Sequence, residues 1–362
     1  MKIRNVLLRS LVGLFIVEFL LALAVPMIPT SKLSLLNIIT PFVPYILLFQ
    51  LPFLAFFLLK RSFKMALLFG AILLFSAPVF YRFYTPGVYL SNEERESELT
   101  VLSYNVSFLS VPKVFKADYF DPDYDHTVLK LRSWVLEKDP DVIFFQEFFN
   151  DRNSKIYHSI EEFEKAGYQH HNYSKTRHDN GLERGVLTFS KYPIVKGGLI
   201  NTSSNNYNAS IFCDVKVDED TIRLVNLHLK SMAFKNKGAT ILNKALGFAR
   251  GYAQASIERS IQIDGVVSVL DSTDYPLIVG GDFNESPFSN SYRKIDQVLD
   301  NAHQSAGSGF GTTFPLKKLP IGVRIDHLFS SESFEVSDFE VYDDVTFSEH
   351  YPIMATYRFH SQ

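Results

Sequence analysis

The first 86 residues of the chain are mostly apolar, whereas the remainder alternates between short apolar runs and polar stretches. Three apolar blocks stand out, at Leu11–Ile28, Leu35–Leu59 and Met65–Phe80. Each is about long enough for a helix to cross a hydrocarbon core of roughly 30 Å. None has a polar face, which disfavours the alternative of a buried helical core in a soluble protein. A signal peptide is a single short block, so we predict three transmembrane helices in a membrane region over residues 1–84.

Basic residues flank these blocks unevenly. Three Lys or Arg residues precede the first block and three separate the second from the third, whereas Lys32 alone lies between the first and second. Lys and Arg concentrate in the cytoplasmic loops of membrane proteins. We therefore expect an integral protein of the cytoplasmic (inner) membrane with a cytoplasmic N-terminus. Three crossings would place the rest of the chain on the outer, periplasmic or extracellular, side.

Beyond the third block the pattern changes to that of an α/β domain. Residues 85–98 contain Pro and Gly and then a run of charge, and we interpret them as a linker. Residues 126–140 have helical spacing, and 236–272 form a long helical stretch with glycine breaks. Short β-rich runs occupy 99–107, 141–147, 184–194, 209–217 and 221–229, and further runs read "YPLIVGGD", "RIDHLFS" and "SDFEVYDD". The pattern predicts one strand-rich domain over residues 99–362.

Composition separates the same two parts. Hydrophobic residues make up 46% of the chain and charged residues 21%, which excludes a disordered protein. The single cysteine, Cys213, excludes an internal disulfide framework and a Cys-rich metal site. Residues 1–86 hold 8 Lys or Arg and one acidic residue, Glu18, so the remainder carries a net charge of −10 against −3 for the whole chain. Nucleic-acid binding favours a basic surface, and the net charge of this domain weighs against it. A local basic strip does exist, with a solvated helix face as the alternative, at Lys230, Lys235, Lys237, Lys244 and Arg250.

Polar side chains recur at or near the ends of the predicted strands. Asn and Asp are common turn formers, so any one of these positions alone has an ordinary explanation. Eight such positions at six strand ends are harder to explain as turns, because ligands of α/β folds bind where strand ends meet at one edge of a sheet. The residues are Asn105, Glu147, His228, Asp282, Asn284, Asp326, Glu349 and His350.

Six motifs in order along the chain carry a resemblance to a known family. They read "SYNV", "FFQE", "NLHLKS", "GGDFNESP", "RIDHLF" and "SEHYPI". As an ordered set they resemble the endonuclease/exonuclease/phosphatase family, which includes DNase I-like nucleases, abasic-site endonucleases, bacterial sphingomyelinases and inositol polyphosphate phosphatases. The resemblance covers about residues 99–359. It implies a four-layer α-β-β-α sandwich with the active site at one end of two packed sheets.

The resemblance also implies a divalent cation, Mg²⁺ or Mn²⁺, and roles for several residues. Glu147 matches the metal-binding Glu of the family, and Asn105 would assist it. Asp282 matches the Asp that orients or deprotonates the attacking water. Asn284 would hold a phosphate oxygen or orient Asp282. Carboxylate oxygens are the ligands that such hard cations prefer.

Two histidines complete the implied site. His350 matches the family His at the scissile phosphate, and Asp326 matches its partner carboxylate. His228 matches a second phosphate-facing His. Arg184 is a possible phosphate contact, with an ordinary surface Arg as the equal alternative. The chain departs from the family at Glu349, where Asp is usual, and this residue would bind the metal directly or through a water.

These observations predict a membrane-anchored, divalent-metal-dependent phosphoesterase that hydrolyses a phosphodiester of nucleic acid or of a lipid headgroup outside the cytoplasm. The alternatives are a phosphomonoesterase acting on a sugar, inositol or lipid phosphate, and a non-catalytic membrane protein that only binds a ligand. The predicted partners are the phosphate ester and the lipid bilayer, with no obligate protein partner evident. We expect "GFGTTFP" (309–315) to border the site and Met232–Phe248 to touch a membrane surface.

Overall fold

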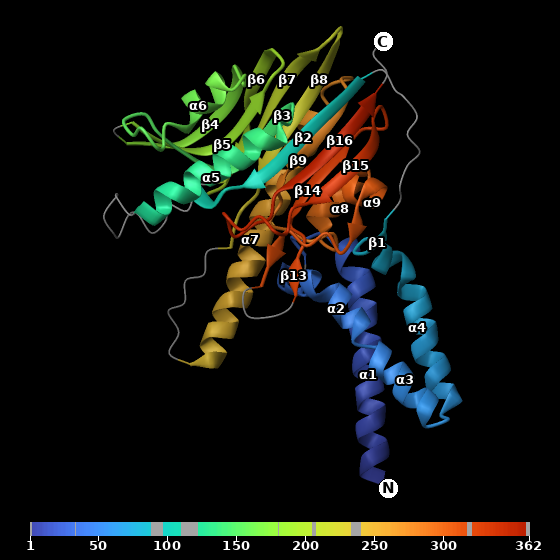
Figure 1. The fold of residues 1–362 in the computed structure, drawn as a ribbon. Coiled ribbons are helices and arrows are strands. Elements are labelled where there is room, and N and C mark those ends of the chain that lie inside the picture. The colour runs from blue at the N-terminus through green and yellow to red at the C-terminus, as the bar shows by residue number, and fades with distance from the viewer. Residues whose placement is uncertain are drawn as a thin grey trace.

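The computed structural model consists of a two-sheet sandwich joined to a group of N-terminal helices (Figure 1). The sandwich lies at the top of the view, and helices α1, α3 and α4 extend from its lower end. The structure describes the chain except for residues 1, 33, 88–96, 110–121, 180, 205–207, 233–239, 317–320 and 360–362.

The two large sheets have six strands each, and both mix parallel and antiparallel neighbours. In the first sheet only β2 and β3 run parallel, and in the second only β8 and β9 do. The first sheet has the order β15 (Glu335–Val341), β16 (Ile353–Phe359), β2 (Ser97–Asn105), β3 (Val142–Asp151), β5 (Leu182–Ser190), β4 (His170–Asp179). The second has the order β10 (Asp300–Asn301), β14 (Asp326–Ser330), β9 (Leu277–Asp282), β8 (Asp220–His228), β7 (Ala209–Val217), β6 (Ile194–Thr202).

Two short ribbons and several helices complete the domain. The ribbons pair β1 (Thr85–Pro86) with β11 (Ser308–Gly309) and β12 (Phe314–Pro315) with β13 (Gly322–Val323). The helices are α5 (Pro122–Lys138), α6 (Ser159–Lys165), α7 (Ile241–Leu270), α8 (Asn290–Asp296) and α9 (Ala302–Ala306).

Three hydrophobic clusters show that the domain has four layers. One cluster lies between the sheets and joins residues of both, such as Phe144 of β3 and Leu328 of β14. A second packs α5 and α6 on the outer face of the first sheet, and a third packs α7 and α8 on the outer face of the second. The predicted α-β-β-α sandwich is confirmed.

The long helix α7 corrects one expectation. The sequence pattern suggested glycine breaks within 236–272, but α7 is a single helix of 30 residues that includes Gly247, Gly251 and Gly265. An isolated glycine costs a helix about 1 kcal/mol, and the packing of the C-terminal half of α7 on the sheet offsets this. The helix begins at Thr240, whose side chain accepts a hydrogen bond from the backbone N–H of Asn243.

The N-terminal region forms more pieces than three helices. The first block forms α1 (Lys2–Ala24) and the short 3₁₀ helix η1 (Val25–Met27), and the third forms α4 (Phe63–Tyr81). The second is divided into the 3₁₀ helix η2 (Ser34–Phe42), α2 (Val43–Leu48) and α3 (Leu51–Leu59). Prolines stand in the first turns of α2 and α3, where their missing N–H groups leave no hydrogen bond unmade.

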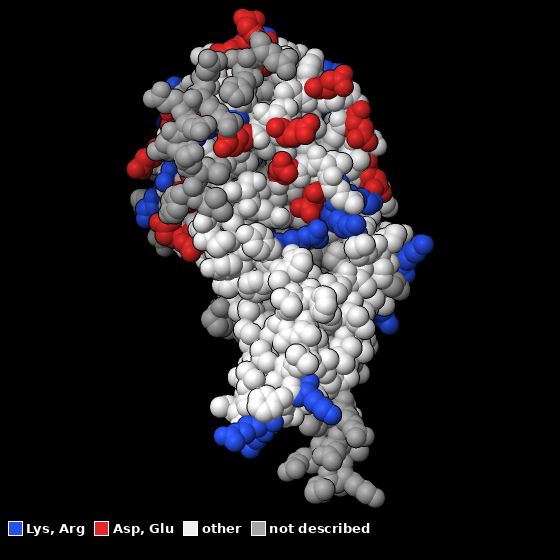
Figure 2. All heavy atoms as spheres, turned by 90° about the vertical axis from the view of Figure 1, so that its right-hand side faces the viewer, with Lys and Arg blue, Asp and Glu red and all other residues white. Residues whose placement is uncertain are grey.

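Two segments of this region are long and apolar enough to cross a membrane, namely Ser34–Leu59 and Phe63–Tyr81, and Val12–Met27 forms a shorter apolar helix. Most of their side chains are not covered by the protein. Figure 2 shows the lower part of the molecule as a largely uncharged surface with basic residues at its far end. The turn between α3 and α4 carries exposed Lys60 and Arg61, and exposed Lys64 lies in the first turn of α4.

The helices dock on the sandwich through specific contacts. Phe288 of the sandwich is buried in a cluster with Ala22, Val43 and Phe83 of the N-terminal region. The Asn290 side chain donates a hydrogen bond to the carbonyl of Pro26 (3.1 Å). After α4, the chain enters the domain directly by pairing β1 with β11.

Candidate active site

The topology brings the polar strand ends to one end of the sandwich. Because β2 and β3 are parallel, Asn105 and Glu147 lie at the same edge of the first sheet. Because β8 and β9 are parallel, His228 and Asp282 are register partners at the corresponding edge of the second. Asn105 of the first sheet and Asp282 of the second are in direct contact, so the two edges meet in one place.

Glycine before Asp282 permits this approach. Gly281 has a φ of +130°, and a Cβ at this position would lie 2.0 Å from the carbonyl oxygen of Leu227 in β8. A side chain here would force β8 and β9 apart. Gly281 is therefore a packing requirement that sets His228 beside the carboxylate.

An irregularity in the pairing of β3 sets the direction of the Glu147 side chain. The pairing of β3 with β5 shifts register between Phe145 and Phe148, and Glu147 itself has a φ of +51°. A bulge re-aims side chains at the end of a strand, and a left-handed conformation at a non-glycine residue is unfavourable by about 1–3 kcal/mol unless its surroundings hold it. Glu147 thereby turns away from the two packed faces of the sheet and lines the cavity.

Asp282 is held by two neighbouring amides. The Asn105 side-chain amide donates to its Oδ2 atom (2.9 Å), and the backbone N–H of Asn284 donates to Oδ1 (2.8 Å). The Asn284 side chain in turn donates to the carbonyl of Leu229 (3.2 Å), and its backbone has a φ of +49°. Both carboxylate oxygens thus have fixed positions.

His350 and Asp326 form a buried pair. The Nδ1 atom of His350 lies 2.9 Å from Asp326 Oδ2, and its Nε2 atom lies 3.8 Å from Asp282 Oδ2. Burial lowers the pKa of His350, but the Asp326 and Asp282 charges outweigh burial and raise the pKa to about 9. Thr313 holds the pair in place, because its hydroxyl accepts a hydrogen bond from the backbone N–H of Asp326 (3.1 Å).

His228 has a different environment. Its Nε2 atom lies 3.6 Å from both Glu147 Oε1 and Asp282 Oδ2, and 2.9 Å from the side-chain amide nitrogen of Asn208. Burial lowers the pKa of His228 to about 4. The two histidines therefore differ, with a neutral imidazole at 228 and a proton-carrying one at 350 near neutral pH.

The buried carboxylates of the site repel one another. Burial raises the pKa of Glu147 to about 7, an effect opposed by His350 and increased by Asp282. Burial also raises the pKa of Asp282, again opposed by His350, while Asp326 raises it further. A divalent cation among these oxygens would relieve both burial and repulsion, so the residues present fit a hard metal ion.

Two overlapping sets of groups could hold such an ion. Among the described residues, ligand atoms of Asp282, Asp326 and His350 lie within 4.8 Å of one another. The set predicted from sequence, Glu147 with Asn105 and Glu349, is adjacent to it through the Asn105–Asp282 hydrogen bond. Asp326 and His350 already bind each other, whereas the Glu147 carboxylate faces the cavity.

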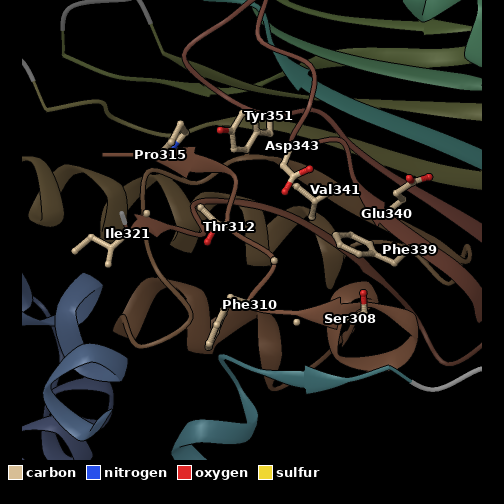
Figure 3. A pocket seen from close by; sticks show the side chains of 13 residues that line it. Ser308, Phe310, Thr312, Pro315, Ile321, Phe339, Glu340, Val341, Asp343 and Tyr351 are labelled. Atoms are coloured by element: carbon tan, nitrogen blue, oxygen red, sulfur yellow. The ribbon is translucent and has the colours of Figure 1, made fainter. Parts of the chain in front are cut away.

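A cavity of about 390 Å³ gives access to these groups. Its lining includes five of the predicted site residues, namely Glu147, Asp282, Asn284, Glu349 and His350. A larger cavity of about 660 Å³ is shown in Figure 3, but Glu340 and Asp343 are the only titratable groups of its lining besides Tyr351. The smaller cavity is therefore the candidate active site.

Arg184 stands apart from the other predicted residues. Asn105, His228 and Asp326 do not line the cavity but contact Asp282 or His350, which do. Arg184 does not line it either, and its guanidinium lies 5.8 Å from the ring centres of Phe108 and Phe149. Sequence reasoning missed Asn208, which contacts His228, because an isolated loop asparagine carries no signal. Of the stretch "GFGTTFP", which was expected to border the site, Phe314 lines this cavity and Thr313 contacts Asp326, whereas the other residues line the larger cavity.

Comparison with known proteins agrees with the fold and the motifs. The sequence profile of the Endonuclease/Exonuclease/phosphatase family matches residues 102–350. An endonuclease/exonuclease/phosphatase from Beutenbergia cavernae DSM 12333 has a similar structure, with 19% identity, a TM-score of 0.52, and coverage of 74% of this chain and 72% of that one.

A structure of TDP2 from Caenorhabditis elegans is similar too, with 17% identity, a TM-score of 0.53, and coverage of 74% and 76%. At these identities the likeness concerns the fold. No curated protein sequence matches the chain.

Proposed function

Because the chain belongs to the endonuclease/exonuclease/phosphatase family, we propose that it is a divalent-metal-dependent hydrolase of a phosphodiester, held at a membrane by its N-terminal helices. The observation that carries the proposal is the convergence of Glu147, Asp282, Asn284 and His350 on one cavity at the end of the sandwich. Hydrolysis of a phosphate ester requires a positioned water, a proton acceptor and donor, and stabilisation of charge.

The side chains can divide these tasks between them. Asp282, fixed by Asn105 and Asn284, orients a water and accepts its proton. His350, whose proton is held by Asp326, stabilises the phosphate charge or protonates the leaving oxygen. The water oxygen bonds to phosphorus, the P–O bond of the leaving alcohol breaks with its electron pair, and a proton is supplied to that alcohol.

A cation, Mg²⁺ or Mn²⁺, would supply positive charge to the phosphate oxygens. We assign Glu147 as its principal ligand, assisted by Asn105 and by Glu349, which is exposed at the cavity. The adjacent Asp282, Asp326 and His350 group is the alternative position. Metal titrations of Glu147→Gln and Asp326→Asn separate the two: the variant with the larger loss of metal affinity identifies the binding set.

The sharpest test of the proposal uses the full chain in detergent. It should hydrolyse a chromogenic phosphodiester with Mg²⁺ or Mn²⁺, and chelation by EDTA should abolish the reaction reversibly. A panel of DNA, RNA, phospholipids and phosphomonoesters under the same conditions ranks the substrate classes. A preference for phosphomonoesters would favour the alternative activity, and no hydrolysis of any ester would favour a non-catalytic ligand-binding protein.

We further propose that the N-terminal helices cross the cytoplasmic membrane and place the sandwich outside the cytoplasm. The support is the uncovered apolar surface of Ser34–Leu59 and Phe63–Tyr81 together with the basic α3–α4 turn. Alkaline phosphatase fused after residue 95 should be active in a bacterial host. An inactive fusion, together with an active cytoplasmic reporter at the same position, would reverse the orientation.

A further inference from the structure

One wall of the active-site cavity is built by the N-terminal region rather than by the sandwich. Ile38, Pro41 and Phe42 of η2 line the same cavity as the catalytic carboxylates. The segment lies along α7, where the Thr40 hydroxyl is 3.5 Å from that of Tyr252. The region that we assign to the membrane therefore reaches the catalytic groups themselves.

Other residues of the lining are apolar as well. Met232 precedes α7 and Phe248 lies on it, while Phe314 and Leu316 come from β12 and the residue after it. The ring of Phe314 packs against His350 with 5.0 Å between ring centres. Phe314 thus places apolar surface beside the catalytic histidine, in the same cavity that Ile38 and Phe42 of η2 line.

The lining offers little to a nucleic-acid backbone. Among the residues that the structure describes, its basic side chains are the catalytic His350 and Arg259. The Arg259 guanidinium is 2.7 Å from the Glu285 carboxylate, both side chains are 1% exposed, and it also donates to the Ser256 hydroxyl. Polynucleotide binding relies on cations that contact successive phosphates, and Arg259 is already neutralised.

From this combination we propose that the substrate is an amphiphilic phosphodiester drawn from the bilayer, a phospholipid in chemical class. This inference rests on the phosphodiester hydrolysis proposed above and names the class of its substrate. The phosphate lies at Asp282 and His350, and part of a hydrocarbon tail lies against Ile38, Phe42 and Phe248. A cavity of about 390 Å³ is of the size that holds small molecules and can enclose only the part of a tail next to the phosphate.

The exit of the cavity agrees with this occupant. Phe42 is 40% exposed and continues into exposed Leu35, which is on the same helix. On the other side Leu242 and Leu246 of α7 are 67% and 45% exposed. Figure 1 shows this end of α7 extending beyond the sandwich toward the side where the N-terminal helices lie. A tail leaving the cavity would meet apolar surface on both sides.

A series of substrates tests the inference on the wild-type chain. p-Nitrophenyl phosphodiesters with alkyl groups of increasing length are hydrolysed by the full chain in one detergent, with Mg²⁺ or Mn²⁺. We expect kcat/KM to rise about fourfold for each methylene, the effect of burying one methylene at ~0.8 kcal/mol, and to level off once the cavity is filled. A rate that does not depend on tail length contradicts the inference.

Two variants test where the hydrocarbon tail of the ester lies in the cavity. Phe42→Ala and Phe248→Ala should each lower the ratio of kcat/KM for the longest ester to that for the methyl ester about tenfold. Phe75→Ala is the matched control, because Phe75 of α4 is 71% exposed but does not line the cavity, and it should not change the ratio. An unchanged ratio in both phenylalanine variants overturns the placement of the tail.

The outcomes also separate this inference from the proposed function. Failure to hydrolyse any ester, tail-less or tailed, would remove both. Metal-dependent hydrolysis of the methyl ester without a tail preference, or faster hydrolysis of DNA or RNA than of any tailed ester, would leave the phosphoesterase in place and remove the lipid substrate.

Discussion

The sandwich buries its apolar side chains, whereas the N-terminal helices leave many of theirs exposed. In the sandwich, core side chains such as Phe144 and Leu328 are completely buried between elements of the same chain. In the helices, Leu67, Leu74 and Phe75 are 71% to 75% exposed. The sandwich buries its apolar side chains by its own folding, whereas the helices leave a large apolar surface uncovered, as surfaces that bind a partner or a membrane do.

The two regions also differ in where their charged and titratable residues lie. The sandwich concentrates buried carboxylates and histidines at one end, where their pKa values move far from ordinary values because burial and mutual charge act together. The helices contain one acidic residue, Glu18, and their basic residues stand mostly at the ends of the apolar blocks. The difference teaches that the titratable groups gather in the sandwich, whereas the helices contribute mainly apolar surface.

The largest effect should come from breaking the chemical end of the sandwich. His350→Ala, Asp282→Ala and Glu147→Ala should each reduce turnover about 10²–10⁴-fold, because each removes a proton-transfer or charge-stabilising group. The thermal unfolding temperature should stay near that of the wild type, since these groups stand at strand ends. Glu332→Gln, at an exposed turn, is the control and should be fully active. Three folded variants that keep more than about a tenth of the rate would disprove the assigned site.

A substitution in the core of the sandwich should lower the free energy of unfolding far more than one on the exposed face of the helices. Leu328→Ala, at a completely buried position between the sheets, should lower the free energy of unfolding of the sandwich by about 2–5 kcal/mol, from lost burial and the cavity that remains. Denaturant unfolding in detergent, followed by near-UV circular dichroism, measures it. A loss below about 1 kcal/mol would mean that the two sheets are not packed as described.

The departure from the family at Glu349 should have an intermediate effect. Glu349→Asp should weaken metal affinity roughly ten- to hundredfold, because the pocket is shaped to the longer side chain, and Glu349→Gln should weaken it further by removing a charge that faces the cation. Titration of activity with Mg²⁺ or Mn²⁺ measures both. If Glu349→Asp matches the wild type at every metal concentration, the position is not adapted to Glu.

We expect the smallest change in the free energy of unfolding from a substitution on the exposed face of the N-terminal helices. Leu74→Ala, at a side chain that is 72% exposed, should change the free energy of unfolding of the detergent-solubilised protein by less than about 0.5 kcal/mol. The same replacement that damages the sandwich at Leu328 should therefore be nearly silent here. A loss comparable to that of Leu328→Ala would show that Leu74 is covered by protein, and would remove the contrast between the two regions.

Much of this could be predicted from local pattern. Continuous apolar runs such as "VIFFQ" mark strands buried on both faces, and the spacing in 126–140 marks an amphipathic helix, which is α5. Strands with polar or mixed sequences were not predicted. β4, "HHNYSKTRHD", and β6, "IVKGGLINT", have no clean alternation, because edge strands form by pairing with a neighbour rather than by their own composition.

By itself the sequence determined the division into an apolar region and a phosphoesterase-like domain, and the eight polar positions at strand ends, because burial and strand periodicity are local properties. Only the tertiary structure decided that Asn105 binds Asp282 across the two sheets, and that Asn208 lies against His228 while Arg184 lies outside the cavity. It also decided that η2 closes the active-site cavity. These contacts join residues far apart in the chain, and their geometry depends on sheet order and on the docking of the helices, which no local pattern encodes.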